Sequence, residues 1–229
     1  MANNIDEFLK LSKEFSSHGY HLYLVGGSVR DFLIHKNEIE DFDLTTDATP
    51  EEMASFLADC DTTFSKYGSV KIKRKKQEYV VTTFRVEGKY KDSRHPSKIT
   101  FVRDMKKDVQ RRDFTINGLY MDDRFKIYDY VGGRDDLSHK LLKMIGKPSK
   151  RIKEDPLRIL RAARFVLRFD FRMDLKLLAA IRKNAKLLTK LNPEKVKEEI
   201  RKMGEVDPNK KAILFNQLNI SKYLEDMLK

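Results

Sequence analysis

The pattern of hydrophobic residues changes near residue 149, and this change restricts the folds open to the chain. Before it, short alternating segments typical of strands lie between turns and helices; after it, no convincing strand follows and capped helix starts recur. The sequence therefore predicts an α+β fold, with a mixed sheet in residues 1–148 and an all-helical domain in residues 149–229. The predicted helix starts in the second region are Asp155-Pro156, Asp174, Asn192-Pro193 and Asp207-Pro208.

The first region holds helices as well as strands. Thr49 and Glu52 around Pro50 form a capping-box helix start. A further helix is predicted from about Asp113, holding RRDFTINGLYM, with its apolar residues Phe114 and Ile116 in the core and its basic residues Arg111 and Arg112 free to face an anion. The predicted strands are 21–25, 41–45, 69–75, 78–85, 99–103 and 125–131.

Charge is distributed unevenly along the 229 residues. The formal net charge is +12, yet residues 1–60 carry −8 and the remainder +20. Such segregation is typical of proteins that bind a polyanion, most often nucleic acid. A solvated Lys-rich surface explains the composition equally well, so composition alone leaves both interpretations open.

Two further features bear on location. Cys60 is the only cysteine, so no intrachain disulfide can form, which fits a reducing compartment. No apolar run approaches the ~20 residues of a membrane-spanning helix. The sequence therefore predicts a cytoplasmic protein without a membrane partner.

The most chemically informative segment is LVGGSVRD, followed by EDFDLTTDAT. Two glycines between a strand and a helix let the backbone approach a phosphate, and Arg30 on the first turns adds positive charge. Asp41 and Asp43 are two apart in a predicted strand, so they share a face and together can hold Mg²⁺. Alone, the DxD pair is more often a solvated strand end; the preceding glycine turn makes the metal-site interpretation stronger.

These segments together resemble the polymerase β-type nucleotidyltransferases, most closely the class II branch of bacterial tRNA nucleotidyltransferases and poly(A) polymerases. The resemblance continues through EGKYKDSRHPSKITF, RRDFTINGLYMD, YDYVGGRDDL and EDPLRILRAARF, in the family's order. It implies a catalytic head with a mixed sheet and a helical neck, with tRNA, CTP and ATP as partners. The site residues that it implies are Asp41 and Asp43 for catalysis and Mg²⁺, Gly27 and Arg30 for the triphosphate, Arg112 for the sugar and phosphates, and Asp155, Arg158, Arg161 and Arg164 for the nucleotide.

The last of these motifs also has a residue-level interpretation. Asp155 and Arg158 are three apart on one helical face, which Arg161 and Arg164 continue. A carboxylate accepts from the exocyclic amine of cytosine or adenine, and a guanidinium donates to the adjacent ring nitrogen, whereas uracil and guanine leave both groups unpaired. The alternative is that Asp155 only caps the helix and the arginines are solvated.

The sequence departs from the family in two places. Where an acid is usual, two residues before Thr-Thr, this chain has Val80; Glu78 could replace it through a bulge or register shift, or the two aspartates suffice, or catalysis is weak. Family members also usually continue well beyond the neck, so the chain is either a piece of a longer protein or a short form. KIKRKK (71–76) could then bind tRNA, or be a solvated edge strand.

Three functions follow from these observations. The first is template-independent addition of C and A to the 3′ end of tRNA, which the family-like loop at 87–98 favours over addition of C alone. The second is a poly(A) polymerase with the same motifs. The third is a catalytically impaired module that binds RNA or nucleotide. The sequence leaves the oligomeric state open.

Overall fold

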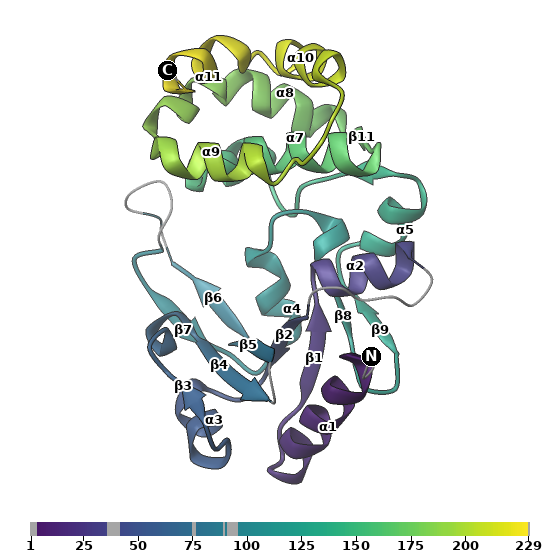
Figure 1. Cartoon of the computed structure of the whole chain (residues 1–229), viewed down its shortest axis with the longest axis vertical. Coiled ribbons are helices and arrows are strands. Elements are labelled where there is room, and N and C mark those ends of the chain that lie inside the picture. Colours follow the sequence, from purple (N-terminus) through teal and green to yellow (C-terminus); the bar gives the residue numbers. More distant parts are fainter. Residues whose placement is uncertain (1–3, 36–41, 75–76, 89, 91–95, 229) are drawn as a thin grey trace. The chain divides into compact units, whose positions relative to one another are not determined.

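The computed structural model describes residues 4–35, 42–74, 77–88, 90 and 96–228, and the chain divides into two compact units (Figure 1). We call them the strand unit and the helical unit. Each is built from segments that are discontinuous in sequence, because the chain passes between the units several times. The strand unit comprises Met1–Gly88, Lys98–Arg112 and Ile116–Arg134, and the helical unit Lys89–Ser97, Asp113–Thr115 and Asp135–Lys229.

Within the described residues, the strand unit is organised around one sheet of seven strands in the order β3-β4-β5-β2-β1-β8-β9 (Figure 1). β2 and β5 pair in parallel, whereas the other neighbours are antiparallel. The sheet is therefore mixed, and the predicted α+β class is confirmed. The strands are β1 Leu22–Val25, β2 Asp43–Thr46, β3 Cys60–Asp61, β4 Ser69–Arg74, β5 Gln77–Thr83, β8 Leu119–Met121 and β9 Ile127–Asp129.

Helices of the strand unit bury their apolar faces against this sheet. Phe8 and Phe15 of α1 are fully buried, and α1 packs against β1. The predicted capping box is confirmed: Thr49 Oγ1 accepts from the N–H of Glu52, whose carboxylate accepts from the N–H of Thr49. The helices are α1 Asn4–Ser17, α2 Gly27–Ile34, α3 Pro50–Phe56 and α4 Met105–Asp108, with 3₁₀ turns η1 Ser65–Tyr67, η2 Val109–Arg111 and η3 Thr115–Asn117.

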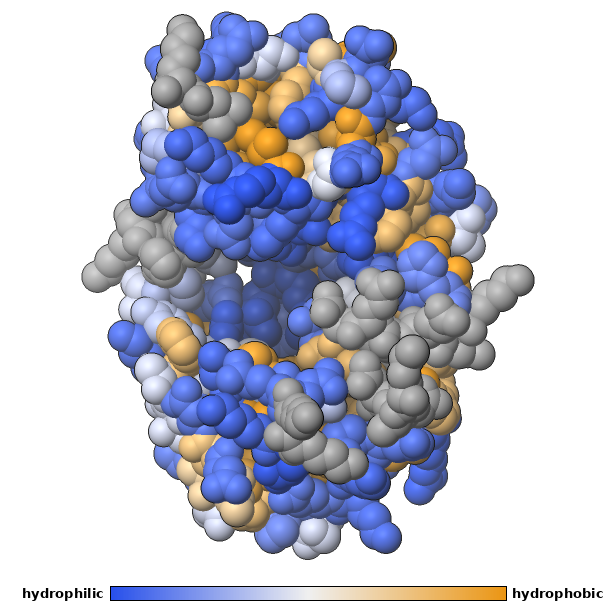
Figure 2. Space-filling view, in the orientation of Figure 1, coloured by the Kyte–Doolittle hydropathy of each residue, from blue (hydrophilic) through white to orange (hydrophobic). Residues whose placement is uncertain are grey.

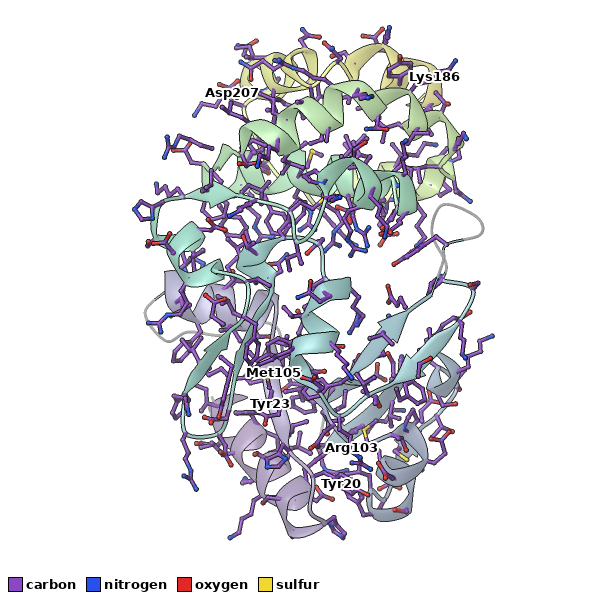
Figure 3. All side chains as sticks on the ribbon, turned by 180° about the vertical axis from the view of Figure 1, so that it is seen from behind. Tyr20, Tyr23, Arg103, Met105, Lys186 and Asp207 are labelled. Carbon is purple, nitrogen blue, oxygen red and sulfur yellow. The ribbon has the colours of Figure 1, made fainter. Side chains whose placement is uncertain are left out.

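A separate two-stranded hairpin, β6 Arg85–Glu87 and β7 Ile99–Phe101, follows β5. The strand predicted over 78–85 is interrupted at Phe84, whose side chain is buried and whose N–H donates to Thr46 O. After β7, the guanidinium of Arg103 lies 5.5 Å from the ring centroid of Tyr20 (Figure 3). This contact joins the segment after the hairpin to the connection between α1 and β1.

The helix predicted from Asp113 is wrong. Only the single 3₁₀ turn η3 forms there, and Leu119–Met121 is a strand, β8, paired with β1 on one side and β9 on the other. All three side chains of β8 are fully buried, so this short apolar run carries no alternation that would distinguish a strand from a helix. The predicted burial of Phe114 and Ile116 is confirmed.

The helical unit forms from the capped starts that the sequence indicated, and α7, α8, α9 and α10 begin at the predicted positions. The expectation of no strand after residue 149 is wrong in one place, since β11 Arg172–Met173 pairs in parallel with β10 Leu141–Leu142. The remaining elements are α5 Gly133–Ser138, α6 Pro148–Glu154, α7 Leu157–Phe169, α8 Leu175–Asn184, η4 Ala185–Lys190, α9 Pro193–Arg201, α10 Pro208–Gln217 and α11 Ser221–Leu228.

The surface is predominantly hydrophilic, and Figure 2 shows polar residues over much of the visible face with smaller hydrophobic patches between them. This agrees with a charged fraction of 36%. No helix in the described part of the chain combines the length and the apolar composition that crossing a membrane requires.

Candidate functional site

A tight glycine turn joins β1 to α2 at the centre of the sheet. Gly26 adopts φ +65°, a left-handed conformation that side chains rarely tolerate, and its N–H donates to Leu119 O. A Cβ on Gly26 would lie 3.7 Å from both Arg112 Nη1 and Asp43 Oδ2. A guanidinium and a carboxylate that are distant from each other in sequence therefore both lie beside the turn.

Asp43 is the first residue of β2 and has an exposed side chain. Its backbone N–H donates to Ser28 Oγ at 2.6 Å, which fixes the start of the strand against α2. A Cβ on Gly27 would lie only 3.2 Å from Asp43 Oδ2, so the absence of a side chain there lets the carboxylate approach the helix. Asp41, the predicted second metal ligand, lies outside the described residues.

Arg30 lies on the first turn of α2 and is nearly buried, with 8% of its surface exposed. Its Nη1 donates to Asn117 Oδ1 at 2.8 Å, and its Nε and Nη2 donate to the carboxylate of Asp31, also at 2.8 Å. Nη2 would lie 3.6 Å from a Cβ on Gly27. The guanidinium is therefore held next to the glycine turn in a fixed orientation.

Arg112 reaches the other side of the turn through a network centred on Asp108, the last residue of α4. Arg112 Nη2 donates to Asp108 Oδ2 at 3.1 Å, and its Nε donates to the hydroxyl of Tyr120 at 3.0 Å. The hydroxyl of Tyr120 donates to the same carboxylate oxygen at 2.7 Å. The position of Arg112 is thus determined by a buried carboxylate and a buried phenol.

Asp108 holds a second arginine as well. Its Oδ1 accepts from Arg111 Nε at 2.9 Å and from the backbone N–H of Arg85 at 2.9 Å. Burial alone would raise the pKa of Asp108, but Arg111 and Arg112 outweigh that effect and, with the Tyr120 hydroxyl, lower the pKa to about 2. The expectation that Arg111 and Arg112 are free is therefore wrong, because both are bound to Asp108.

Val80 occupies the position beside Asp43 on the parallel neighbour β5. Because paired residues of adjacent strands project from the same face, the Val80 side chain, 40% exposed, lies on the face that carries Asp43. Glu78 does not replace it: the register of β5 runs without a bulge through both residues, and the Glu78 carboxylate pairs with Lys71 Nζ at 2.9 Å.

Lys71 belongs to β4, which is not the terminal strand of the sheet because β3 follows it, although β3 pairs with β4 only at Lys71 and Ile72. Lys75 and Lys76 of the basic run lie outside the described residues, as do residues 89 and 91–95 of the loop predicted over 87–98.

In the helical unit, two of the predicted arginines are each paired with a carboxylate. Arg161 Nε donates to Asp113 Oδ2 at 2.7 Å, and this neighbour raises the pKa of Arg161. Arg164 Nε donates to Glu199 Oε2 at 3.0 Å, where Glu199 is 3% exposed. Both arginines lie on α7, one turn apart.

The other two predicted residues of this unit lie at the start of α7. Asp155 Oδ1 accepts from the N–H of Leu157 at 3.0 Å, so Asp155 does cap the helix. Arg158 is 5% exposed; its Nη1 donates to Arg151 O at 2.6 Å, and its guanidinium lies 5.9 Å from the ring centroid of Tyr90.

The strand unit thus brings Gly27, Arg30, Asp43 and Arg112 around one turn. The sequence interpretation missed Asp108, although its spacing of three and four residues before two arginines is a helical ion-pair signal. It also missed Ser28 and Asn117, whose contacts depend on tertiary structure. Among the described residues, no group of three or more His, Cys, Asp or Glu side chains is arranged to hold a metal ion.

Comparison with known proteins identifies the family of the chain. The model of the poly A polymerase head domain matches residues 22–143. The CCA-adding enzyme of Listeria innocua is 38% identical over 223 residues, covering 96% of this chain and 56% of that protein. The CCA-adding enzyme of Enterococcus faecalis is 40% identical over 203 residues, covering 89% of this chain and 50% of that protein.

A solved structure shows the same fold. The crystal structure of the Bacillus stearothermophilus CCA-adding enzyme in complex with CTP superposes with a TM-score of 0.79 and 35% identity, covering 89% of this chain and 49% of that chain. The chain therefore spans about half the length of the relatives that it matches.

Proposed function

The chain belongs to the family of the poly A polymerase head domain, and from this premise we propose that it adds C and A nucleotides from CTP and ATP to the 3′ end of tRNA without a template. The observation that carries the proposal is the exposed Asp43 carboxylate beside a glycine turn that Arg30 and Arg112 flank. Relatives named CCA-adding enzymes, 38–40% identical, support this specificity over a poly(A) polymerase.

In the proposed reaction, the 3′-hydroxyl oxygen of the RNA attacks the α-phosphorus of CTP or ATP. A new phosphodiester bond forms, the bond to the leaving pyrophosphate breaks, and the hydroxyl proton passes to water. The backbone at Gly27 accommodates the triphosphate, and Arg30 and Arg112 offset its negative charge. Because other side chains already orient both guanidiniums, little entropy is lost when the triphosphate binds.

We further propose that the reaction requires Mg²⁺. The exposed Asp43 carboxylate is a hard oxygen donor of the kind this ion prefers, and Asp41, two residues earlier, would be its companion ligand. When bound there, Mg²⁺ favours deprotonation of a hydroxyl and offsets charge on the leaving pyrophosphate.

The remaining assignments divide the chain by role. We propose residues 1–148 as the catalytic head and residues 149–229 as a neck that selects the nucleotide and binds RNA, with the reaction in the cytoplasm, which the single cysteine fits. Base selection would use the pairing of a carboxylate and a guanidinium with cytosine or adenine. The residues assigned to it are Asp155, Arg158, Arg161 and Arg164.

The test is an extension assay on a tRNA transcript that ends at the discriminator base, supplied with CTP and ATP singly and together. We expect Mg²⁺-dependent extension that stops after CCA. Asp43→Ala should reduce the rate by at least ~1000-fold, because it removes a carboxylate proposed to act in the transition state. Glu51→Ala, at an exposed position of α3, makes the same charge change and is the matched control. Long A tracts formed without CTP would refute the proposal.

A further inference from the structure

A solvent-accessible cavity lies within the helical unit, away from the arginines of α7 described above. It is an open pocket with a volume of about 540 Å³, bordered by the end of α8, the start of η4 and the corner between α10 and α11. Its lining includes two cations, two amides, a hydroxyl and a phenol, and none of its described lining residues is acidic. The lining residues are Arg182, Ala185, Asn216, Asn219, Ser221, Lys222 and Tyr223.

Both cations are held in place. Arg182 is exposed, and its Nε donates to Gln217 O at 2.6 Å, which ties the guanidinium to the end of α10. Within the described residues neither Nη1 nor Nη2 of Arg182 donates a hydrogen bond, so one planar edge of the guanidinium remains to bind a ligand. The ammonium of Lys222 lies 4.9 Å from the ring centroid of Tyr223, which restricts its long side chain.

Two of the neutral side chains are hydrogen-bonded to each other. Ser221 Oγ donates to Asn216 Oδ1 at 2.5 Å, so the serine proton is used within the protein and the NH₂ group of Asn216 is the neutral donor of this pair. Asn219 adopts φ +58° at the corner, where the chain leaves α10 and begins α11. The corner therefore places side chains from two helices at the same cavity.

The charge around the cavity is mixed, since Glu225 lies one turn after Lys222 on α11 and a further cation lies on η4. Lys186 of η4, labelled in Figure 3, extends the basic character of the segment that begins at Arg182, and α11 packs against η4. A guanidinium with two parallel N–H groups matches the oxygens of a phosphate, and an ammonium adds a point charge.

We propose that this cavity binds a backbone phosphate of the RNA substrate. The inference rests on the proposed function for the identity of the RNA, but it concerns a site that the proposed chemistry does not use. Each phosphate neutralised by Arg or Lys displaces condensed cations, so the site contributes to affinity in a salt-dependent way.

The experiment measures binding of a tRNA transcript ending at the discriminator base by fluorescence anisotropy, over a series of salt concentrations. We expect Arg182→Gln/Lys222→Gln to weaken binding at least about tenfold at 0.1 M salt and to reduce the slope of log K against log salt by about one, because one phosphate contact is lost. Lys176→Gln/Lys210→Gln removes the same charge from exposed positions outside the cavity and should change both quantities much less. Arg182→Lys in place of Arg182→Gln in the cavity variant keeps one positive charge and should restore part of the affinity.

Three results would overturn the proposal: no change in tRNA affinity for the cavity variant, equal changes in both double variants, or loss of affinity for inorganic phosphate or pyrophosphate without loss of tRNA affinity. Thermal melting verifies that each variant is folded.

The extension assay separates the two proposals. If the wild type binds tRNA but does not extend it, the proposed function fails while the binding data still decide the cavity. If Asp43→Ala abolishes extension but the cavity variant binds normally, only the cavity proposal fails.

Discussion

The two units hold their arginines in different ways. In the strand unit Arg111 and Arg112 share the single buried carboxylate of Asp108, whereas in the helical unit Arg161 and Arg164 each pair with a carboxylate of their own. The side chains of Arg111, Arg112 and Arg164 are each 14% exposed, whereas that of Arg161 is 34% exposed. Arg161 is therefore the most open of the four guanidiniums.

This difference has consequences for binding. With Arg85 and Glu87 included, the strand-unit cluster contains three guanidiniums and two carboxylates, so it keeps a net positive charge. A fixed positive cluster suits a triphosphate, whose charge is the same for every nucleotide. An arginine that pairs with a single carboxylate and is partly exposed suits discrimination between nucleotides, because a base can compete with that carboxylate for the guanidinium. Substitutions that remove the carboxylate from each kind of ion pair test this distinction.

The largest expected effect is on stability, from Asp108→Asn. This change leaves two buried guanidiniums without their shared counter-charge, and we expect a loss of about 3 kcal/mol in the free energy of unfolding. Glu199→Gln removes the counter-charge of Arg164 and of the half-exposed Lys202, which lies 3.9 Å away, and should cost about 1 to 2 kcal/mol. Urea denaturation of both variants measures the difference, and equal losses would show that the two arrangements are energetically alike.

The second prediction concerns acid. The folded pKa of Asp108 is about 2, below its unfolded value of 3.8, so its ionisation stabilises the fold above pH 4. That contribution, about 2 kcal/mol, disappears as the pH falls from 4 toward 2. Urea midpoints measured across this range should fall more steeply for the wild type than for Asp108→Asn, which lacks the titrating group. Parallel curves would contradict the assignment.

The third prediction separates the two glycines of the turn. Gly27→Ala places a Cβ 3.2 Å from Asp43 Oδ2, so the carboxylate must shift by a few tenths of an ångström, and we expect kcat for extension to fall about tenfold with little change in stability. Gly26→Ala instead forces a side chain into φ +65° and should lower the free energy of unfolding by about 1 kcal/mol. Extension kinetics and urea denaturation of both variants test this contrast. If both variants lost kcat alone, or both lost stability alone, the two glycines would not have separate roles.

The sequence predicted what depends on local chemistry. Capped helix starts such as Asp174, the capping box at Thr49 and the glycine turn all follow from the preferences of a few adjacent residues. It did not predict β8, because a strand buried on both faces has no alternation, nor the sharing of Asp108, because the final positions of Arg111 and Arg112 depend on packing around Tyr120. Local rules identify the site residues as candidates, while their partners are set by the tertiary fold.

The smallest expected effect concerns Val80 of the strand unit. Val80 pairs with Asp43 in the parallel register and shares its face, so the carboxylate of Val80→Glu would lie beside that of Asp43. A further acid there can accept the proton of the attacking hydroxyl, and we expect the single-turnover extension rate to rise about threefold to tenfold. Val80→Gln matches the size without the charge and should leave the rate unchanged. Because Glu78 is paired with Lys71, the native chain has no carboxylate available for this role on β5 within the described residues. If the rate for Val80→Glu is no higher than that for Val80→Gln, the reaction does not need a carboxylate at this position.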